Sequence, residues 1–241
     1  MKLALVHLDS RPFDFEHNIT EIERSYVASL CNKPDIVLYP ELAISGYFMI
    51  TDKTLLTEEN IRYNEECLQK LVNTVKLSGV PICIGAVKNN QSVYILIDDV
   101  GVNVIHTRNA HNGTSNVGNF IIKNTKMSVI ICDESMHMRM VDAALESNPD
   151  IILHPSAFGE PLPCVDYPLV CSPLNNNKLS NTLFVTINIS STDIHGDRSY
   201  GRTSIMKGNA VLFSISSNKT QIILYDTVLD TVNTRQISNA T

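Results

Sequence analysis

The alternation of short apolar runs with longer segments of helical spacing constrains the fold of this chain most. Buried strands are expected at the apolar runs 3–8, 35–40, 81–87, 126–132, 150–155 and 182–187. Helices are expected at 15–31, 57–78 and 138–147. A hairpin is expected at 92–98 and 102–107, and a β-rich end at 203–206, 210–215 and 221–225. Strands and helices that alternate without a break favour one α/β domain spanning residues 1–241.

The composition is that of a globular protein with a sizeable core. Hydrophobic residues make up 44% of the 241 residues and charged residues 18%, which excludes wholesale disorder. The net charge of −6, with 19 scattered basic residues, argues against a nucleic-acid-binding surface. No apolar run reaches the roughly 18–20 residues of a membrane span, and the N-terminus turns polar too soon for a signal peptide. We therefore expect a cytoplasmic protein without a membrane partner, whose six cysteines are free thiols.

A glutamate follows the second predicted strand. Strand 35–40 ends at Pro40, and Glu41 opens the loop that runs to Tyr47. Residues just beyond strand ends commonly form active sites in α/β folds. A carboxylate that is partly desolvated there has a raised pKa, which suits a general base. The alternative is a surface glutamate in a turn.

A cysteine follows the predicted strand 126–132, directly before a predicted helix. This arrangement resembles a nucleophile elbow, a sharp strand-to-helix turn that exposes one side chain beside a backbone N–H. Cys132 is then the nucleophile, and the Asp133 amide can donate to an oxyanion. The alternative is a buried structural cysteine, because the neighbouring acids Asp133 and Glu134 raise the thiol pKa.

The sequence indicates neither a metal nor a cofactor. Met136 and Met138 flank His137 and are possible soft metal ligands, but methionines at a helix start pack into the core more often. Single histidines near strand ends, at 7, 106, 111 and 154, are expected to be hydrogen-bonded structural residues. No glycine-rich phosphate loop supports nucleotide binding.

Together the two strand ends resemble the motifs of the nitrilase, or carbon–nitrogen hydrolase, superfamily. PELAISGY at 40–47 matches the glutamate motif of that family almost letter for letter, and VIICDE at 129–134 is similar to its nucleophile motif. PSAF at 155–158 follows at the family spacing, and 199–205 and 208–212 resemble its closing strands. The resemblance covers nearly the whole chain. It implies a four-layer α-β-β-α sandwich with Glu41 as general base and Cys132 as nucleophile.

The main departure from the family concerns its catalytic lysine. No lysine occurs between Lys88 and Lys123. Alignment on His111 places Asn109 at the lysine position, and a shift of one residue places Arg108 there. Side-chain alternation along the predicted strand puts Val102, Val104, His106 and Arg108 on one face, and the pair His106 and Arg108 reproduces the family's ring and cation. This favours Arg108, and Asn109 stays open because strand ends often bulge.

The resemblance implies a cofactor-independent thiol hydrolase of a non-peptide carbon–nitrogen bond. The substrate is a small amide or carbamoyl compound, and a thioester forms on Cys132. The expected oxyanion and substrate-binding residues, besides Arg108 or Asn109, are Asp133, Glu134, Tyr47, His111, His137 and Phe158. Two alternatives stay open: an acyltransferase that uses the same residues and passes the thioester to an amine, and a degenerate homologue that binds a small ligand or a partner chain without turnover. A homodimer is expected, formed by the helix after Cys132 and the region 158–180.

Overall fold

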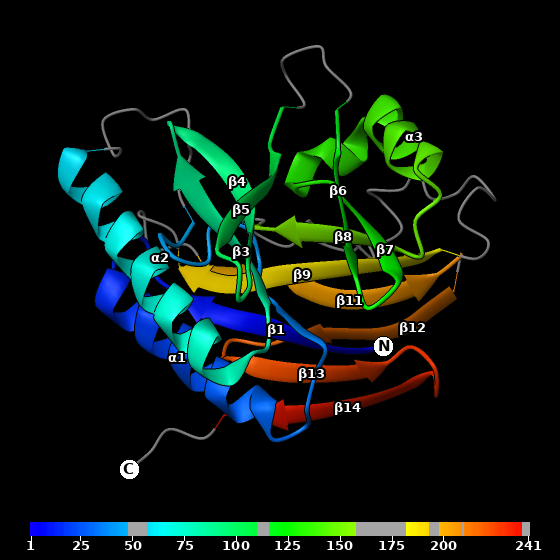
Figure 1. Cartoon of the computed structure of the whole chain (residues 1–241), viewed down its shortest axis with the longest axis horizontal. Coiled ribbons are helices and arrows are strands. Elements are labelled where there is room, and N and C mark those ends of the chain that lie inside the picture. Colours follow the sequence, from blue (N-terminus) through cyan, green and yellow to red (C-terminus); the bar gives the residue numbers. More distant parts are fainter. Residues whose placement is uncertain (48–56, 110–115, 158–181, 193–197, 209, 238–241) are drawn as a thin grey trace.

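The computed structural model describes residues 1–47, 57–109, 116–157, 182–192, 198–208 and 210–237. Two β-sheets pack face to face, and helices cover both outer faces (Figure 1). This is the α-β-β-α sandwich that the resemblance implied. No helix in the described ranges combines the length and apolarity that crossing a membrane requires.

The first sheet carries three parallel strands at its centre, in the order β5-β4-β3-β2-β1-β13-β14. The antiparallel pair β4–β5 extends one side and the hairpin β13–β14 the other. The strands are β1 (Lys2–Ser10), β2 (Ile36–Leu38), β3 (Ile82–Lys88), β4 (Gln91–Ile97), β5 (Val102–Thr107), β13 (Gln221–Asp226) and β14 (Thr231–Gln236).

The second sheet has the order β6-β7-β8-β9-β11-β12, with β7, β8 and β9 parallel. The end of β1 pairs with β9, at Leu8 and Ile189, and so joins the two sheets. The strands are β6 (Gly118–Ile122), β7 (Thr125–Val129), β8 (Ile151–Ser156), β9 (Leu183–Thr192), β11 (Arg202–Lys207) and β12 (Ala210–Ser216). A short strand, β10 (Arg198–Tyr200), pairs with the end of β9.

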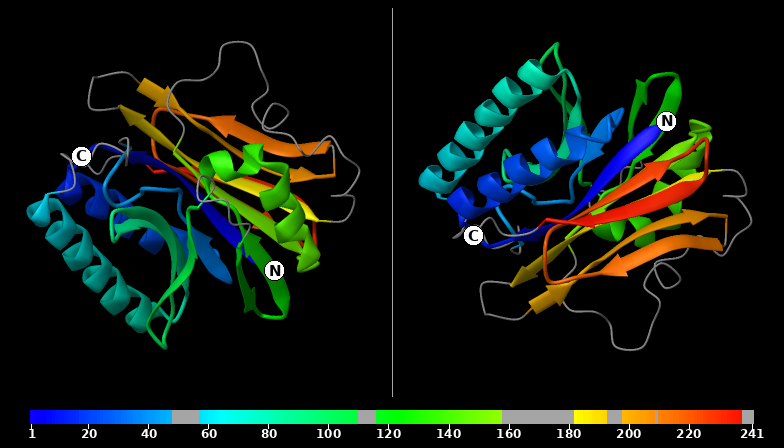
Figure 2. Two further views of the ribbon diagram at one scale, coloured as in Figure 1. Left: turned by 90° about the horizontal axis from the view of Figure 1, so that it is seen from above. Right: turned by 90° about the horizontal axis from the view of Figure 1, so that it is seen from below.

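The helices are α1 (Phe15–Leu30), α2 (Glu58–Ser78) and α3 (Met138–Glu146), with a 3-10 helix, η2 (Cys132–Met136), before α3. In Figure 1, α1 and α2 lie side by side on one side of the molecule and α3 on the other, and the views of Figure 2 agree. Along β1, Leu3 and Leu5 pack between the sheets, whereas Ala4 and Val6 pack under α1 and α2. Both faces of β1 are therefore buried, as its apolar run predicts.

Two strands of the described residues lie outside the predicted ranges, β6 and β14, and the segment 199–205, expected as one closing strand, is divided between β10 and β11. β14 is a largely polar edge strand that pairs with β13, and its side chains are mostly exposed. It therefore lacks the apolar run that marks a buried strand. The predicted strand 126–132 ends at Val129, so Cys132 begins the turn that follows instead of closing the strand.

Candidate active site

Cys132 lies where the chain turns from β7 into η2, and its φ is +53°, in the left-handed region that side chains other than glycine seldom adopt. Ile131 N–H donates to Glu134 Oε2 at 2.6 Å. The carbonyl oxygen of Cys132 accepts from Ser135 Oγ at 3.0 Å and from His154 Nε2 at 2.8 Å. The sharp turn expected from the sequence is present, and the strained residue is the cysteine itself.

Glu41 follows β2 in the other sheet and is held by a close approach of two backbone segments. Gly85 N–H donates to Pro40 O at 3.0 Å, and a Cβ atom at Gly85 would lie 2.5 Å from Glu41 Cα. Glycine is therefore needed at position 85 for this approach. The Glu41 side chain is 1% exposed, so the alternative of a surface glutamate in a turn is wrong.

Arg108 follows β5 and connects the two strand ends. Its Nε donates to Asp133 Oδ1 at 2.9 Å, and its Nη2 lies 2.8 Å from Asp133 Oδ2. Its Nη1 donates to Glu41 Oε1 at 3.3 Å. The two parallel contacts to Asp133 fix the plane of the guanidinium, and the third directs its charge at Glu41.

Asn109 is placed differently. Its backbone N–H donates to Glu134 Oε1 at 2.7 Å, and its side-chain Nδ2 donates to Asn116 O at 3.2 Å. The structure therefore places the Arg108 side chain, and not that of Asn109, against Glu41.

A bulge in β5 underlies this placement. Tyr94 pairs with His106, but the next residue, Ile95, pairs with Val104, so Ile105 is the extra residue. Val104 is 41% exposed, whereas His106 is 5% exposed. The predicted common face of Val102, Val104, His106 and Arg108 is therefore wrong at its first half, because the bulge reverses the alternation.

The buried Glu134 connects the end of β5 to the turn at residues 131–134 that carries Cys132. Besides Ile131 and Asn109, it accepts a hydrogen bond from His106 Nε2, at 2.8 Å to Oε2. Its side chain is fully buried. A carboxylate with three donors is well satisfied in such a place. Glu134 therefore holds the site together and is not presented to a substrate in this structure.

The electrostatics couple Glu41 and Cys132. Burial raises the pKa of the Glu41 carboxyl, while Arg108 and hydrogen bonds from Ser92 and Cys132 act in the opposite direction. Burial and the negative Glu41 raise the pKa of the Cys132 thiol well above its ordinary value, and Arg108 again opposes this effect. Cys132 is therefore a thiol at neutral pH, and it ionises most readily by giving its proton to Glu41.

His154 supports the cysteine turn from β8. Burial lowers its pKa to about 4, so the ring is neutral at neutral pH. Its Nε2 carries the proton that is donated to Cys132 O, and its Nδ1 accepts from Thr186 Oγ1 at 3.2 Å. The expectation of hydrogen-bonded structural histidines is confirmed at His7, His106 and His154.

The remaining predicted residues lie as follows. Tyr47 is partly buried and packs against a small apolar cluster that includes Leu42 and Ala157. His137 lies at the junction of η2 and α3, where its backbone N–H donates to Glu134 O at 3.0 Å. His111 and Phe158 lie outside the described residues.

Sequence reasoning missed Ser92. This serine is 2% exposed on β4, and its Oγ donates to Glu41 Oε1 at 2.8 Å. A hydroxyl at the start of the otherwise apolar run 93–97 was the available signal, because a buried polar group in a strand needs a partner.

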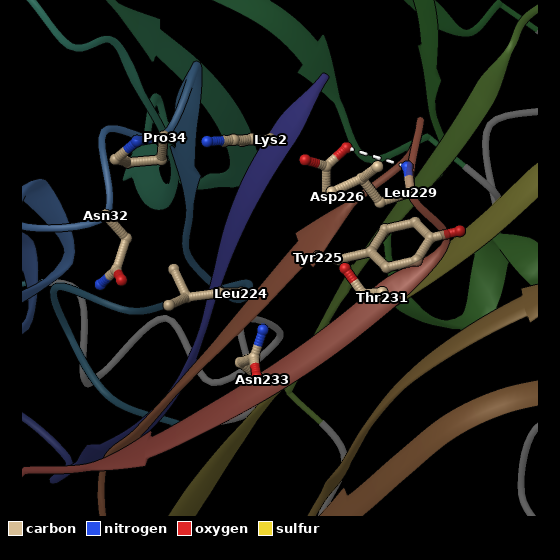
Figure 3. A pocket seen from close by; sticks show the side chains of 9 residues that line it. All are labelled: Lys2, Asn32, Pro34, Leu224, Tyr225, Asp226, Leu229, Thr231 and Asn233. Carbon is tan, nitrogen blue, oxygen red and sulfur yellow. Dashed lines mark hydrogen bonds between the residues drawn. The ribbon is translucent and has the colours of Figure 1, made fainter.

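A separate pocket of about 220 Å³ lies near the start of β1, away from the strand ends that carry the candidate site. Lys2, Asn32 and Pro34 line it on one side and the hairpin β13–β14 on the other (Figure 3). It contains none of the candidate residues.

No protein-family model and no curated protein sequence matches the chain. Solved structures do match. A glutamate-to-glutamine mutant of the amidase from Nesterenkonia sp. AN1, carrying the Michael adduct of acrylamide at its active-site cysteine, aligns with a TM-score of 0.77 and 16% identity. The alignment covers 95% of this chain and 94% of that chain.

A cysteine-to-serine mutant of the same amidase, described as from the nitrilase superfamily, aligns with a TM-score of 0.79 and 16% identity, over 95% of this chain and 92% of that chain. Another mutant carries the acetamide moiety of fluoroacetamide, added covalently at its active-site cysteine. It aligns with a TM-score of 0.74 and 15% identity, over 92% of this chain and 89% of that chain. At such low identity, the likeness shows that this chain has the nitrilase fold.

Proposed function

We propose that this chain is a cofactor-independent thiol hydrolase of a carbon–nitrogen bond in a small amide or carbamoyl compound. The observation that carries the proposal is the convergence of Glu41, Arg108 and Cys132. They come from the ends of three strands in two sheets and meet in a cluster where Glu41 and Cys132 are buried and Arg108 is partly buried. The nitrilase-superfamily amidase structures, with adducts at an active-site cysteine, support it as relatives in fold.

The first half of the reaction forms a thioester. Glu41 takes the proton of Cys132, and the thiolate attacks the carbonyl carbon of the substrate. The oxyanion is held by the Asp133 N–H and by Arg108. Three of the five guanidinium N–H groups are used in the contacts to Glu41 and Asp133, which leaves two for the substrate.

The second half of the reaction releases the acid. Glu41, protonated in the first step, gives its proton to the leaving amine as the carbon–nitrogen bond breaks. It then takes a proton from water, which attacks the thioester and frees Cys132. One carboxyl group thus acts alternately as base and acid, and its raised pKa suits both roles.

The test is the intact mass of the protein after incubation with a panel of small amides, together with ammonia release. The wild type should release ammonia and show a thioester adduct, and Cys132→Ala should do neither. Transfer of the acyl group to an added amine, with little free acid, would identify an acyltransferase. Saturable binding of amides without adduct or ammonia would overturn the proposal in favour of a binding protein.

A further inference from the structure

Ser92 makes two contacts at the candidate site. Its Oγ donates to Glu41 Oε1 at 2.8 Å. Its carbonyl oxygen accepts the backbone N–H of Arg108 at 2.9 Å. One buried residue of β4 therefore links the side chain of Glu41 to the main chain of the arginine.

The two oxygens of the Glu41 carboxyl have different surroundings. Oε1 accepts two hydrogen bonds, from Ser92 Oγ and from Arg108 Nη1. Oε2 is buried and has no hydrogen-bond partner within normal distance in the described part of the chain. The Cys132 side chain faces the Glu41 carboxyl and acts to lower its pKa. With Oε1 filled, Oε2 is the oxygen available to the thiol.

We infer that Ser92 is a positioning residue that reserves Oε2 of Glu41 for the proton of Cys132, an inference that rests on the proposed hydrolase mechanism. A proton arriving on Oε1 would displace the hydrogen bond from Ser92 or from Arg108, whereas a proton on Oε2 displaces neither. As the S–H bond breaks, its electron pair stays on Sγ and an O–H bond forms at Oε2. Glu41 becomes neutral, Cys132 becomes a thiolate, and the total charge of the pair is unchanged.

Within the described residues, the charged and titratable groups that face Glu41 are Arg108 from the end of β5 and Cys132 and Asp133 from η2. Removal of the Ser92 hydroxyl changes none of these charges. It removes one of the hydrogen bonds that lower the Glu41 pKa, so protonation of Glu41 moves to higher pH.

The experiment compares the wild type with Ser92→Ala and with Ser92→Thr, which keeps the hydroxyl. The matched control is Ser29→Ala, because Ser29 is fully buried and donates to Tyr26 O in α1, outside the site. Two quantities are measured against pH: the rate of Cys132 alkylation by iodoacetamide, followed by peptide mapping, and kcat and KM for an amide.

In Ser92→Ala, the acidic midpoint of both profiles should move to higher pH. The value of kcat should fall by about 10-fold to 100-fold with little change in KM, because the misplaced group acts in the chemical step. Ser92→Thr should restore the wild-type midpoint, and Ser29→Ala should overlay the wild type. If circular dichroism shows that Ser92→Ala is unfolded, Ser92→Cys replaces it, since a thiol has similar volume and donates weakly.

Overlaid profiles of Ser92→Ala and the wild type would overturn the inference, as would a fall in kcat without a shifted midpoint. A Cys132 that stays unlabelled at every pH in the wild type would also overturn it, because no proton transfer to Glu41 would then take place. The proposed function can fail separately. If the wild type turns over no amide while Ser92→Ala still shifts the pH midpoint of Cys132 alkylation, the hydrolase proposal is wrong and the positioning role of Ser92 is retained.

Discussion

Arg108 supplies the positive charge that faces Glu41, Cys132 and Asp133 together. Loss of this charge removes the proposed oxyanion donor and leaves the buried Glu41 and the partly exposed Asp133 without their shared partner. We therefore expect Arg108→Ala to lower kcat/KM by about a hundredfold or more. Asn109→Ala should cost little in kcat/KM, because the Asn109 contact to Glu134 is made by its backbone N–H.

Arg108→Lys refines this test, since it keeps the charge but loses the paired contacts to Asp133. An intermediate rate is expected for it. Steady-state kinetics on the three variants is the measurement. Equal and small effects of Arg108→Ala and Asn109→Ala in an active enzyme would show that another group holds the oxyanion.

Asp133 combines two roles, because its carboxylate orients Arg108 and its charge raises the pKa values of Glu41 and Cys132. In Asp133→Asn this negative charge is absent, so the Glu41 pKa falls. The acidic limb of the pH profile of kcat/KM should then move to lower pH, while the maximal rate drops as Arg108 loses its anchor. Glu146→Gln on the exposed side of α3 is the control and should leave the profile in place. An acidic limb that moves to higher pH would contradict the claim that the Asp133 charge raises the Glu41 pKa.

Among the secondary-structure elements, β3 and the loop after β2 come into close backbone contact at Gly85. A methyl group at this position would lie 2.5 Å from both Glu41 Cα and Pro40 O. Gly85→Ala should push the Glu41 loop away from β3 and lower kcat by about tenfold or more, because small displacements of a base are costly.

The control for this element is Gly79→Ala at the end of α2. Gly79 has φ +72°, and a Cβ atom there would meet nothing within 4 Å. Both variants should lower the melting temperature, the first through a clash and the second through backbone strain. Kinetics on the folded protein should separate them, since Gly79→Ala should keep the wild-type kcat. Equal kcat values for the two variants would show that a side chain at position 85 does not displace Glu41.

At the scale of the whole molecule, two buried neutral histidines make stability depend on pH. Burial lowers the pKa of His154 to about 4 and also lowers that of His7. Below the ordinary histidine pKa of about 6.5, the unfolded chain takes up protons that the folded chain does not. The free energy of unfolding should therefore fall as pH drops from about 6.5 to about 4, by up to about 3 kcal/mol for His154.

Urea denaturation at several pH values measures this dependence. His154→Asn should flatten it over the same interval while lowering stability at neutral pH. Glu41 acts in the opposite sense, because its raised pKa favours the folded state as pH falls. Because Glu41 offsets part of the histidine effect, the difference between the two proteins is the test: a His154→Asn variant with the same pH dependence as the wild type between about pH 6.5 and about pH 4 would contradict the buried neutral state of His154.

We expect the chain to form a homodimer. Of the two parts assigned to the interface, α3 is described and the region 158–180 lies outside the described residues. Met136 and Met138, just before and at the start of α3, are 61% and 40% exposed, which suits an apolar contact. Light scattering at micromolar concentration should give a dimer mass, and Met138→Asp should shift it toward the monomer. A monomer mass for the wild type would contradict the dimer.

The order of the buried strands and helices, and the positions of Glu41 and Cys132 at strand ends, can be predicted from the sequence. These features are local: apolar periodicity marks buried elements, and the residue after a strand is defined by the chain. The sequence favoured Arg108 and left Asn109 open, whereas the contact between Arg108 and Glu41, and the place of Ser92 in the same site, are seen only in the folded protein. Arg108 and Glu41 are 67 residues apart, and Ser92 and Glu41 are 51 apart. The bulge at Ile105 and the hydrogen bond from Asn109 to Glu134 accompany the placement of Arg108, and both depend on pairing with other segments of the chain, which no local pattern encodes.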